Sequence, residues 1–196
     1  MRYLLSHALL EYVLPVRLTM SRKTRSLTLS AVFTALTIAL LYFASIWPTG
    51  QLAITAIASF LTAAAVIESD LLYGVYTFVA AAILGFILLP DKNIPFLYAV
   101  FFGYYPIIKS LIERLKSVLL QWVLKLAVFF ISLTIMWLFM RQLIITTLPL
   151  PGNTISAVII YIIGAAIFIL YDYGYSKAIG LYLGRVSKYF KKGNIK

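Results

Sequence analysis

The chain has 196 residues, of which 63% are hydrophobic and only 12% are charged, and its formal net charge is +11. A soluble domain is roughly half apolar, and the mean hydropathy of +0.98 lies well above what such a domain shows. The sequence has no cysteine and one histidine, His7, which excludes disulfides, thiol chemistry and a histidine-cluster metal site. Hydrolytic or metal-dependent chemistry would then have to rest on six carboxylates alone. We therefore predict that the protein is not an enzyme and has no cofactor.

The apolar residues fall into six blocks, each close to the ~20 residues that a helix needs to cross a bilayer. We therefore predict an all-α integral membrane protein with six transmembrane helices in one domain, residues 21–176, followed by a basic tail, residues 177–196. The predicted spans are, in chain order, Leu27–Trp47, Gln51–Ile67, Leu71–Leu89, Ile94–Leu111, Val118–Met140 and Thr154–Tyr171. Pro48-Thr49-Gly50 predicts a tight turn after the first span.

The basic residues indicate how the spans are oriented. An even number of spans puts both termini on one side, and 14 of the 17 Lys and Arg residues lie on that side. Only Lys92 and Arg141 lie opposite, and Lys125 is inside a span. Because cytoplasmic loops are rich in Lys and Arg, we predict cytoplasmic N- and C-termini in the cell membrane. The same distribution favours anionic membrane lipids as partners and argues against nucleic acid.

Residues 1–20 do not fit the six-span plan. Pro15 interrupts their apolar stretch, and no small-residue cleavage site follows an apolar core, so neither a span nor a signal peptide is predicted. Two interpretations remain. The segment is an amphipathic helix at the membrane surface, or it precedes the true translation start, for which Met20 is the natural candidate.

A stripe of small residues marks the first span, where Ala31, Ala35 and Ala39 recur every four residues. Positions i and i+4 share one face of a helix, and small residues let helices approach closely in membranes. We therefore expect the stripe to contact another helix, either in the same bundle or in a partner protein. Three hydroxyl residues are expected to extend it toward the cytoplasm: Thr24, Thr28 and Ser30.

The stretch TRSLTLSAVFTAL that contains this stripe, together with the length and the six spans, resembles the substrate-binding S components of energy-coupling factor (ECF) transporters. In that family the first span often reads Arg/Lys-x-Leu-x-x-x-Ala-x-x-x-Ala-Leu, and the matching residues here are Arg25, Leu27, Ala31, Ala35 and Leu36. The resemblance implies a protein that binds a small-molecule solute at the outer face. It also implies that the alanine face docks on a transmembrane coupling subunit served by ABC ATPases.

One feature departs from the family. The loop after the first span is long in many S components and closes over the ligand, whereas here it is three residues. A structural role is the alternative, because six-span proteins of the MreD type resemble S components in size and plan but act as scaffolds in cell-wall elongation. An enzyme acting on lipids is disfavoured, since no span carries the closely spaced carboxylates that would hold Mg²⁺.

Aromatic and polar residues within or beside the spans are candidates for binding the solute. Gly103 and Pro106 predict a kink in the fourth span, beside aromatic side chains that could stack on a planar ligand or simply form an interfacial belt. Lys125 lies inside the fifth span, where a charge usually faces the bundle interior or a polar cavity. The candidate ligand-binding residues are Trp47, Tyr98, Phe102, Tyr105, Lys125 and Asn153.

Ion pairs are predicted near the cytoplasmic boundary. Lys109 and Glu113 are four residues apart and can pair on one helix face. Asp172 is expected to be an exposed carboxylate at the end of the sixth span, near Lys177. Lys125 has three candidate partners at this boundary: Glu68, Asp70 and Glu113.

Overall fold

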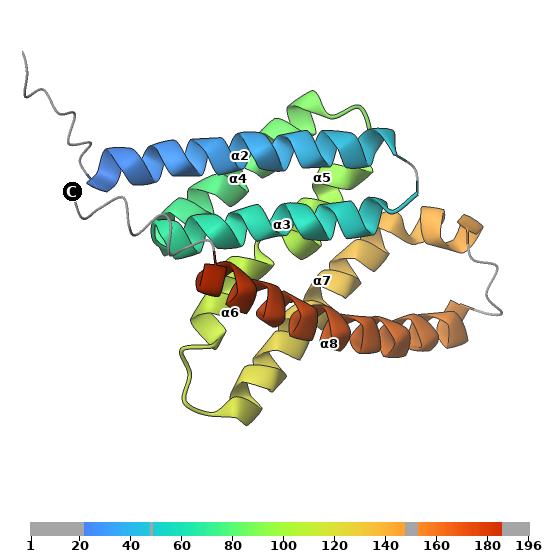
Figure 1. Cartoon of the computed structure of the whole chain (residues 1–196). Coiled ribbons are helices and arrows are strands. Elements are labelled where there is room, and N and C mark those ends of the chain that lie inside the picture. Colours follow the sequence, from blue (N-terminus) through green and yellow to red (C-terminus); the bar gives the residue numbers. More distant parts are fainter. Residues whose placement is uncertain (1–21, 48, 148–152, 186–196) are drawn as a thin grey trace, which may run out of the picture.

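The computed structural model of the chain describes residues 22–47, 49–147 and 153–185, which form helices and no strand (Figure 1). The helices are α2 (Arg22–Ile46), α3 (Gln51–Glu68), α4 (Leu71–Leu88), α5 (Asn93–Leu97), the π-helix η1 (Tyr98–Phe102), α6 (Tyr105–Ile112), α7 (Val118–Thr147) and α8 (Asn153–Arg185). Six segments are long and apolar enough to cross a membrane, the fourth being α5, η1 and α6 together. The predicted all-α membrane protein with six spans is confirmed, while residues 1–20 and most of the basic tail lie outside the described residues.

Successive spans run in alternate directions (Figure 1). We refer to the end where α2 begins and α8 ends as the basic end, and to the opposite end as the far end. The sequence predicts that the basic end is cytoplasmic. The turn at the far end between α2 and α3 is tight, because Gly50 has a φ of +90°, which residues with a side chain rarely adopt.

The last two helices are longer than predicted. Helix α7 continues to Thr147 and α8 continues to Arg185. The prediction that the sixth span ends at Tyr171 is wrong, because the next residue, Asp172, is buried inside the bundle rather than exposed at a helix end. A carboxylate that is paired with buried lysines does not terminate a helix in a membrane.

Helices α2, α3 and α4 pack through small side chains. A Cβ on Gly74 of α4 would lie 2.2 Å from the Cγ2 atom of Val66 in α3, so these two backbones are unusually close. Between α2 and α4, the Ser30 and Thr77 hydroxyl oxygens lie 2.9 Å apart. Close backbones and interhelical hydrogen bonds are what hold membrane helices together. Ser30 therefore faces the bundle, and the prediction that it extends the alanine stripe is wrong.

The sequence predicts a kink in the fourth span, and the structure has a break there, between η1 and α6. The Gly103 N–H donates to the Tyr98 carbonyl at 2.6 Å, which closes the wide turn of η1, and α6 starts two residues later with Pro106 in its first turn. Proline fits there because the first turn of a helix needs no N–H donor. The aromatic residues of η1 extend from the far half of the fourth span to the centre of the bundle.

Gly103 should be difficult to replace, even by alanine. A Cβ at this position would lie 2.7 Å from the ring of Tyr98 and 2.8 Å from the ring of Phe78, and Tyr98 is fully buried. We expect Gly103→Ala to lower the free energy of unfolding by about 1–3 kcal/mol, the usual cost of overpacking a core. Unfolding in detergent checks this. The matched control is Gly174→Ala in α8, where nothing lies within 4 Å of the added Cβ, and equal destabilisation by both changes would contradict the expectation.

Candidate functional site

A cavity of about 290 Å³ lies between α3, the broken fourth span, α7 and α8. It occupies the middle and far half of the bundle, since the α3 residues that line it come from the start of that helix at the far end. Its lining is Leu52, Ala53, Ala56, Leu97, Phe101, Phe102, Phe129, Leu133, Met136, Gly164, Ile167, Phe168 and Tyr171. The size is at the lower end of ordinary ligand pockets, which run from about 300 Å³ upward.

Aromatic rings form much of the cavity wall. Phe129 of α7 and Phe168 of α8 stack with ring centroids 4.6 Å apart, and Phe101 meets Phe129 edge-on at 5.4 Å. On the other side, Phe102 meets Tyr171 edge-on at 5.5 Å. These contacts hold the rings of η1, α7 and α8 at fixed angles to one another. The aromatic wall is therefore built by packing between helices.

A buried network of charges lies next to the cavity, toward the basic end. Asp172 of α8 accepts from Lys109 of α6 at 2.5 Å and from Lys125 of α7 at 3.0 Å, one lysine on each carboxylate oxygen. The Tyr105 hydroxyl donates to the same carboxylate at 2.5 Å. All three charged side chains are no more than 5% exposed. Asp172 thus joins α6, α7 and α8 at a single point inside the bundle.

Glu113 is the fourth charged residue of this network and its most exposed member. Its Oε1 atom lies 2.6 Å from the Lys109 Nζ and 2.9 Å from the Lys125 Nζ, so two cations face two carboxylates. Partial burial raises the pKa of the Glu113 carboxyl, but the hydrogen bonds and charges of the two lysines outweigh that effect and hold the pKa below its ordinary value. Buried charges are tolerated only when they are paired in this way. We refer to Tyr105, Lys109, Glu113, Lys125 and Asp172 as the charge network.

The charge network has a structural character. Its two lysines and two carboxylates are paired with one another, and the described residues contain no group of three or more His, Cys, Asp or Glu side chains able to hold a metal ion. The network holds α8 in place, and the Ser176 hydroxyl of this helix also accepts a hydrogen bond from Lys109 at 2.8 Å. Since Tyr171 of the cavity wall directly precedes Asp172, the network also sets the position of that wall.

The structure separates the candidate ligand-binding residues rather than bringing them to one site. Phe102 lines the cavity. Tyr105 and Lys125 belong to the charge network, and the Tyr98 hydroxyl lies 2.8 Å from the Thr62 hydroxyl oxygen in the core. Trp47 is exposed at the far end, stacked on Phe43. Asn153 begins α8, but its side chain lies outside the described residues.

The predicted ion pairs are partly confirmed. Lys109 pairs with Glu113, and of the three candidates for Lys125 it is Glu113 that binds it. The prediction that Asp172 is exposed near Lys177 is wrong, because Asp172 is buried and is the second partner of both lysines. A carboxylate among tyrosines has the same sequence pattern whether it faces water or two lysines on other helices.

Most of the cavity wall was not among the sequence-based candidates. A signal for it exists: Gly164, Ile167, Phe168 and Tyr171 recur at the spacing of one helix face, as do Phe129, Leu133 and Met136. In a membrane span, however, apolar residues cover every face. The spacing alone cannot tell a cavity wall from a lipid-facing surface.

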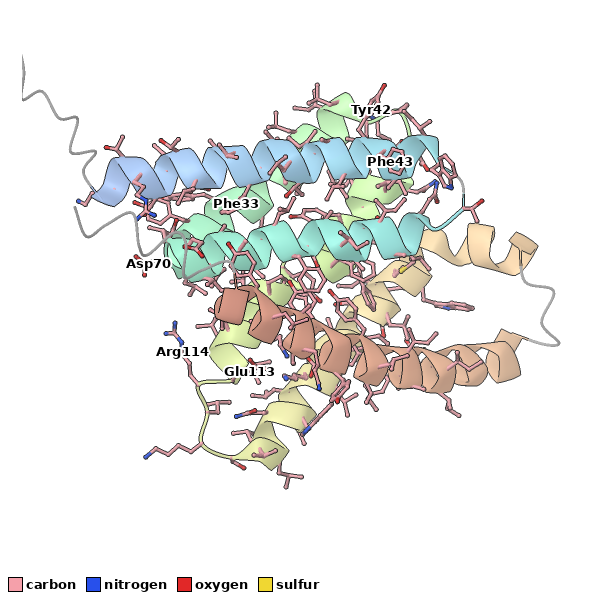
Figure 2. The ribbon with its side chains drawn as sticks, in the orientation of Figure 1. Phe33, Tyr42, Phe43, Asp70, Glu113 and Arg114 are labelled. Atoms are coloured by element: carbon pink, nitrogen blue, oxygen red, sulfur yellow. The ribbon has the colours of Figure 1, made fainter. Side chains whose placement is uncertain are left out.

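The alanine stripe lies on the exposed face of α2. Ala31, Ala35 and Ala39 are all exposed, whereas the opposite face of the helix is buried. Phe33 illustrates that buried face: it lies between α2 and α3 in Figure 2, and it packs on Ala64 and Ala65 of α3. Within the described part of the chain, no other helix covers the stripe.

Comparison with models of known protein families, with characterised proteins and with solved structures finds no match to this chain.

Proposed function

We propose that this protein is the solute-binding subunit of an ECF-type importer in the cell membrane, and that α2 docks it on a transmembrane coupling subunit. The observation that carries the proposal is the exposure of Ala31, Ala35 and Ala39 on a helix whose other face is fully engaged by α3 and α4. A helix that faces only lipid gains nothing from small residues in a row. A helix that receives another protein's helix does, because van der Waals packing drives association in the membrane.

The residues at either end of the stripe support this interpretation. Leu27 and Phe43 continue the same four-residue spacing on both sides of the three alanines, and both are exposed and bulky. The alanines thus form a shallow groove on the helix surface, about two turns long, between two large side chains. Such a surface selects the register of an incoming helix as well as allowing its close approach.

The cavity supplies the second part of the proposed function. It lies against α3, the fourth span, α7 and α8, and none of its lining residues comes from α2. Solute and coupling subunit would therefore use different faces of the protein, so that docking does not block binding. The chain has no Walker A sequence, so in the proposed importer ATP would be hydrolysed by the partner ATPases.

The direct test is recovery of the tagged protein from its native membranes in a mild detergent, with mass spectrometry of the proteins that accompany it. We expect a membrane coupling subunit together with ABC ATPases. Recovery of wall-synthesis proteins without ATPases, combined with rounded cells and normal uptake after depletion, would refute the importer and identify an MreD-like scaffold.

A further inference from the structure

The cavity offers a solute almost no polar partner. Of its thirteen lining residues only Tyr171 has a hydroxyl, amide or charged side chain, and the Tyr171 hydroxyl oxygen already lies 3.1 Å from Ser59 Oγ. The neighbouring Asp172 is held by two lysines of the charge network. A charged or strongly hydrogen-bonding molecule would lose its hydration here and would gain no hydrogen bonds in return. The occupant must be neutral and apolar.

The aromatic residues that line the cavity favour a ligand with a flat ring. Five aromatic side chains contribute to the wall, and the faces of Phe129 and Phe168 are stacked with one another. Flat molecules gain from stacked or edge-on contact with such rings beyond the burial of area. An apolar cavity of about 150 Å³ holds one benzene, so about 290 Å³ fits a molecule of about two fused rings.

The opening of the cavity lies between α3 and α8. Among the lining residues the exposed ones include Leu52 at the start of α3, which is 60% exposed, and Ile167 of α8, which is 62% exposed. Toward the basic end the two helices are joined, because the hydroxyls of Tyr171 and Tyr175 both reach Ser59, each at 3.1 Å. Leu52 and Ile167 both lie within membrane spans. Ile167 lies well inside its span, while Leu52 is the second residue of its span, so the opening extends from the far membrane boundary toward the hydrocarbon of the bilayer.

We infer that the cavity binds a small, neutral, apolar ring compound that is dissolved in the membrane, and that the compound enters sideways between α3 and α8. The inference deepens the proposed function, since it takes the cavity as the solute site, but it requires no partner protein. It also accounts for the short turn between α2 and α3, because a solute that arrives from the membrane needs no loop to close over it from the aqueous side.

The test uses the full-length protein in phosphatidylcholine nanodiscs and a naphthalene that carries an aryl diazirine. Irradiation followed by mass spectrometry should place the label on the cavity-lining segments of α3, η1, α7 and α8, and unlabelled naphthalene should displace it. Ala53→Trp, at the opening, should lower this saturable labelling at least about tenfold, the effect of ~1.4 kcal/mol in binding. Ile167→Trp should act likewise from the α8 side. Ala127→Trp is the matched control, since Ala127 is exposed on α7 and does not line the cavity.

Four results would overturn the inference. Labelling that does not saturate, or that the Ala53 and Ala127 variants change equally, would show that the cavity does not select the ring. Equal saturable labelling by a photoreactive phospholipid acyl chain would make a lipid tail the occupant. Competition by naphthalene-1-sulfonate as strong as that by naphthalene would refute a neutral ligand. Because no coupling subunit is present, failure of the docking proposal would leave the labelling intact, and failure of the labelling would leave docking intact.

Discussion

Replacing Asp172 with alanine should destabilise this protein more than any other single charge removal. The change leaves Lys109 and Lys125 buried, with one partly exposed carboxylate, Glu113, between them. Removing one member of a buried ion pair typically costs about 3–5 kcal/mol, because the remaining charge is uncompensated. We expect a loss of that size in the free energy of unfolding. It can be measured by adding SDS to the protein in mild detergent and following tryptophan fluorescence, which Trp122 beside Lys125 should report.

Two further variants separate lost charge balance from lost packing. Asp172→Ala combined with Lys125→Met leaves Lys109 paired with Glu113, so the double variant should recover more than half of the stability that the single variant loses. Such non-additivity is expected for residues in one network. Asp70→Ala removes an exposed carboxylate at the same end of the bundle, where it precedes α4 without a capping hydrogen bond from its side chain, and should change stability by no more than about 1 kcal/mol. If Asp172→Ala were as mild as Asp70→Ala, the charge network would not hold α6, α7 and α8 together.

Placing tryptophan at Ala31 and Ala35 together should strongly weaken association with the proposed coupling subunit. Both positions are exposed, so the bundle itself has room for the larger side chains. A helix docked on the stripe would be pushed outward and would lose its close backbone contact. Since overpacking costs about 1–3 kcal/mol per site, we expect the recovered partner to fall at least tenfold, and uptake of the solute with it, about what ~1.4 kcal/mol produces.

The control for this change is a pair of tryptophans at exposed alanines of other helices, Ala127 in α7 and Ala166 in α8. These changes add the same bulk to the lipid-facing surface and should leave recovery of the partner unaltered. Thermal unfolding of each purified variant would show that the protein itself remains folded. Normal complex formation and uptake by the Ala31 and Ala35 variant would remove α2 as the docking helix.

The general plan of the fold follows from features that are local in the sequence. Hydropathy located all six spans, and Gly103 with Pro106 located the break in the fourth, because each feature depends on residues close together in the chain. The orientation of α2 about its axis is different. Ser30 and Ala31 are neighbours in sequence, and only the contact of Ser30 with Thr77, 47 residues away, turns Ser30 inward and the alanines outward.

The site depends even more on distant contacts. Asp172 finds its lysines 63 and 47 residues earlier in the chain, and no pattern around YDYGYSK distinguishes that environment from a solvated helix end. The pair Lys109 and Glu113 was predictable because both residues lie on one helix, four positions apart. The cavity was not predictable, since its lining comes from α3, the fourth span, α7 and α8, which are far apart in the sequence.

The composition of the charge network has a consequence for how the protein responds to membrane voltage. Moving one charge through the whole field of a membrane at 100 mV involves about 2.3 kcal/mol. The network carries two lysines and two carboxylates, so if it shifts as one body the electrical work on its members cancels. A movement of the network as one body would therefore be neither driven nor opposed by the resting potential. Asp172→Asn would leave one net positive charge and would make the same movement sensitive to voltage.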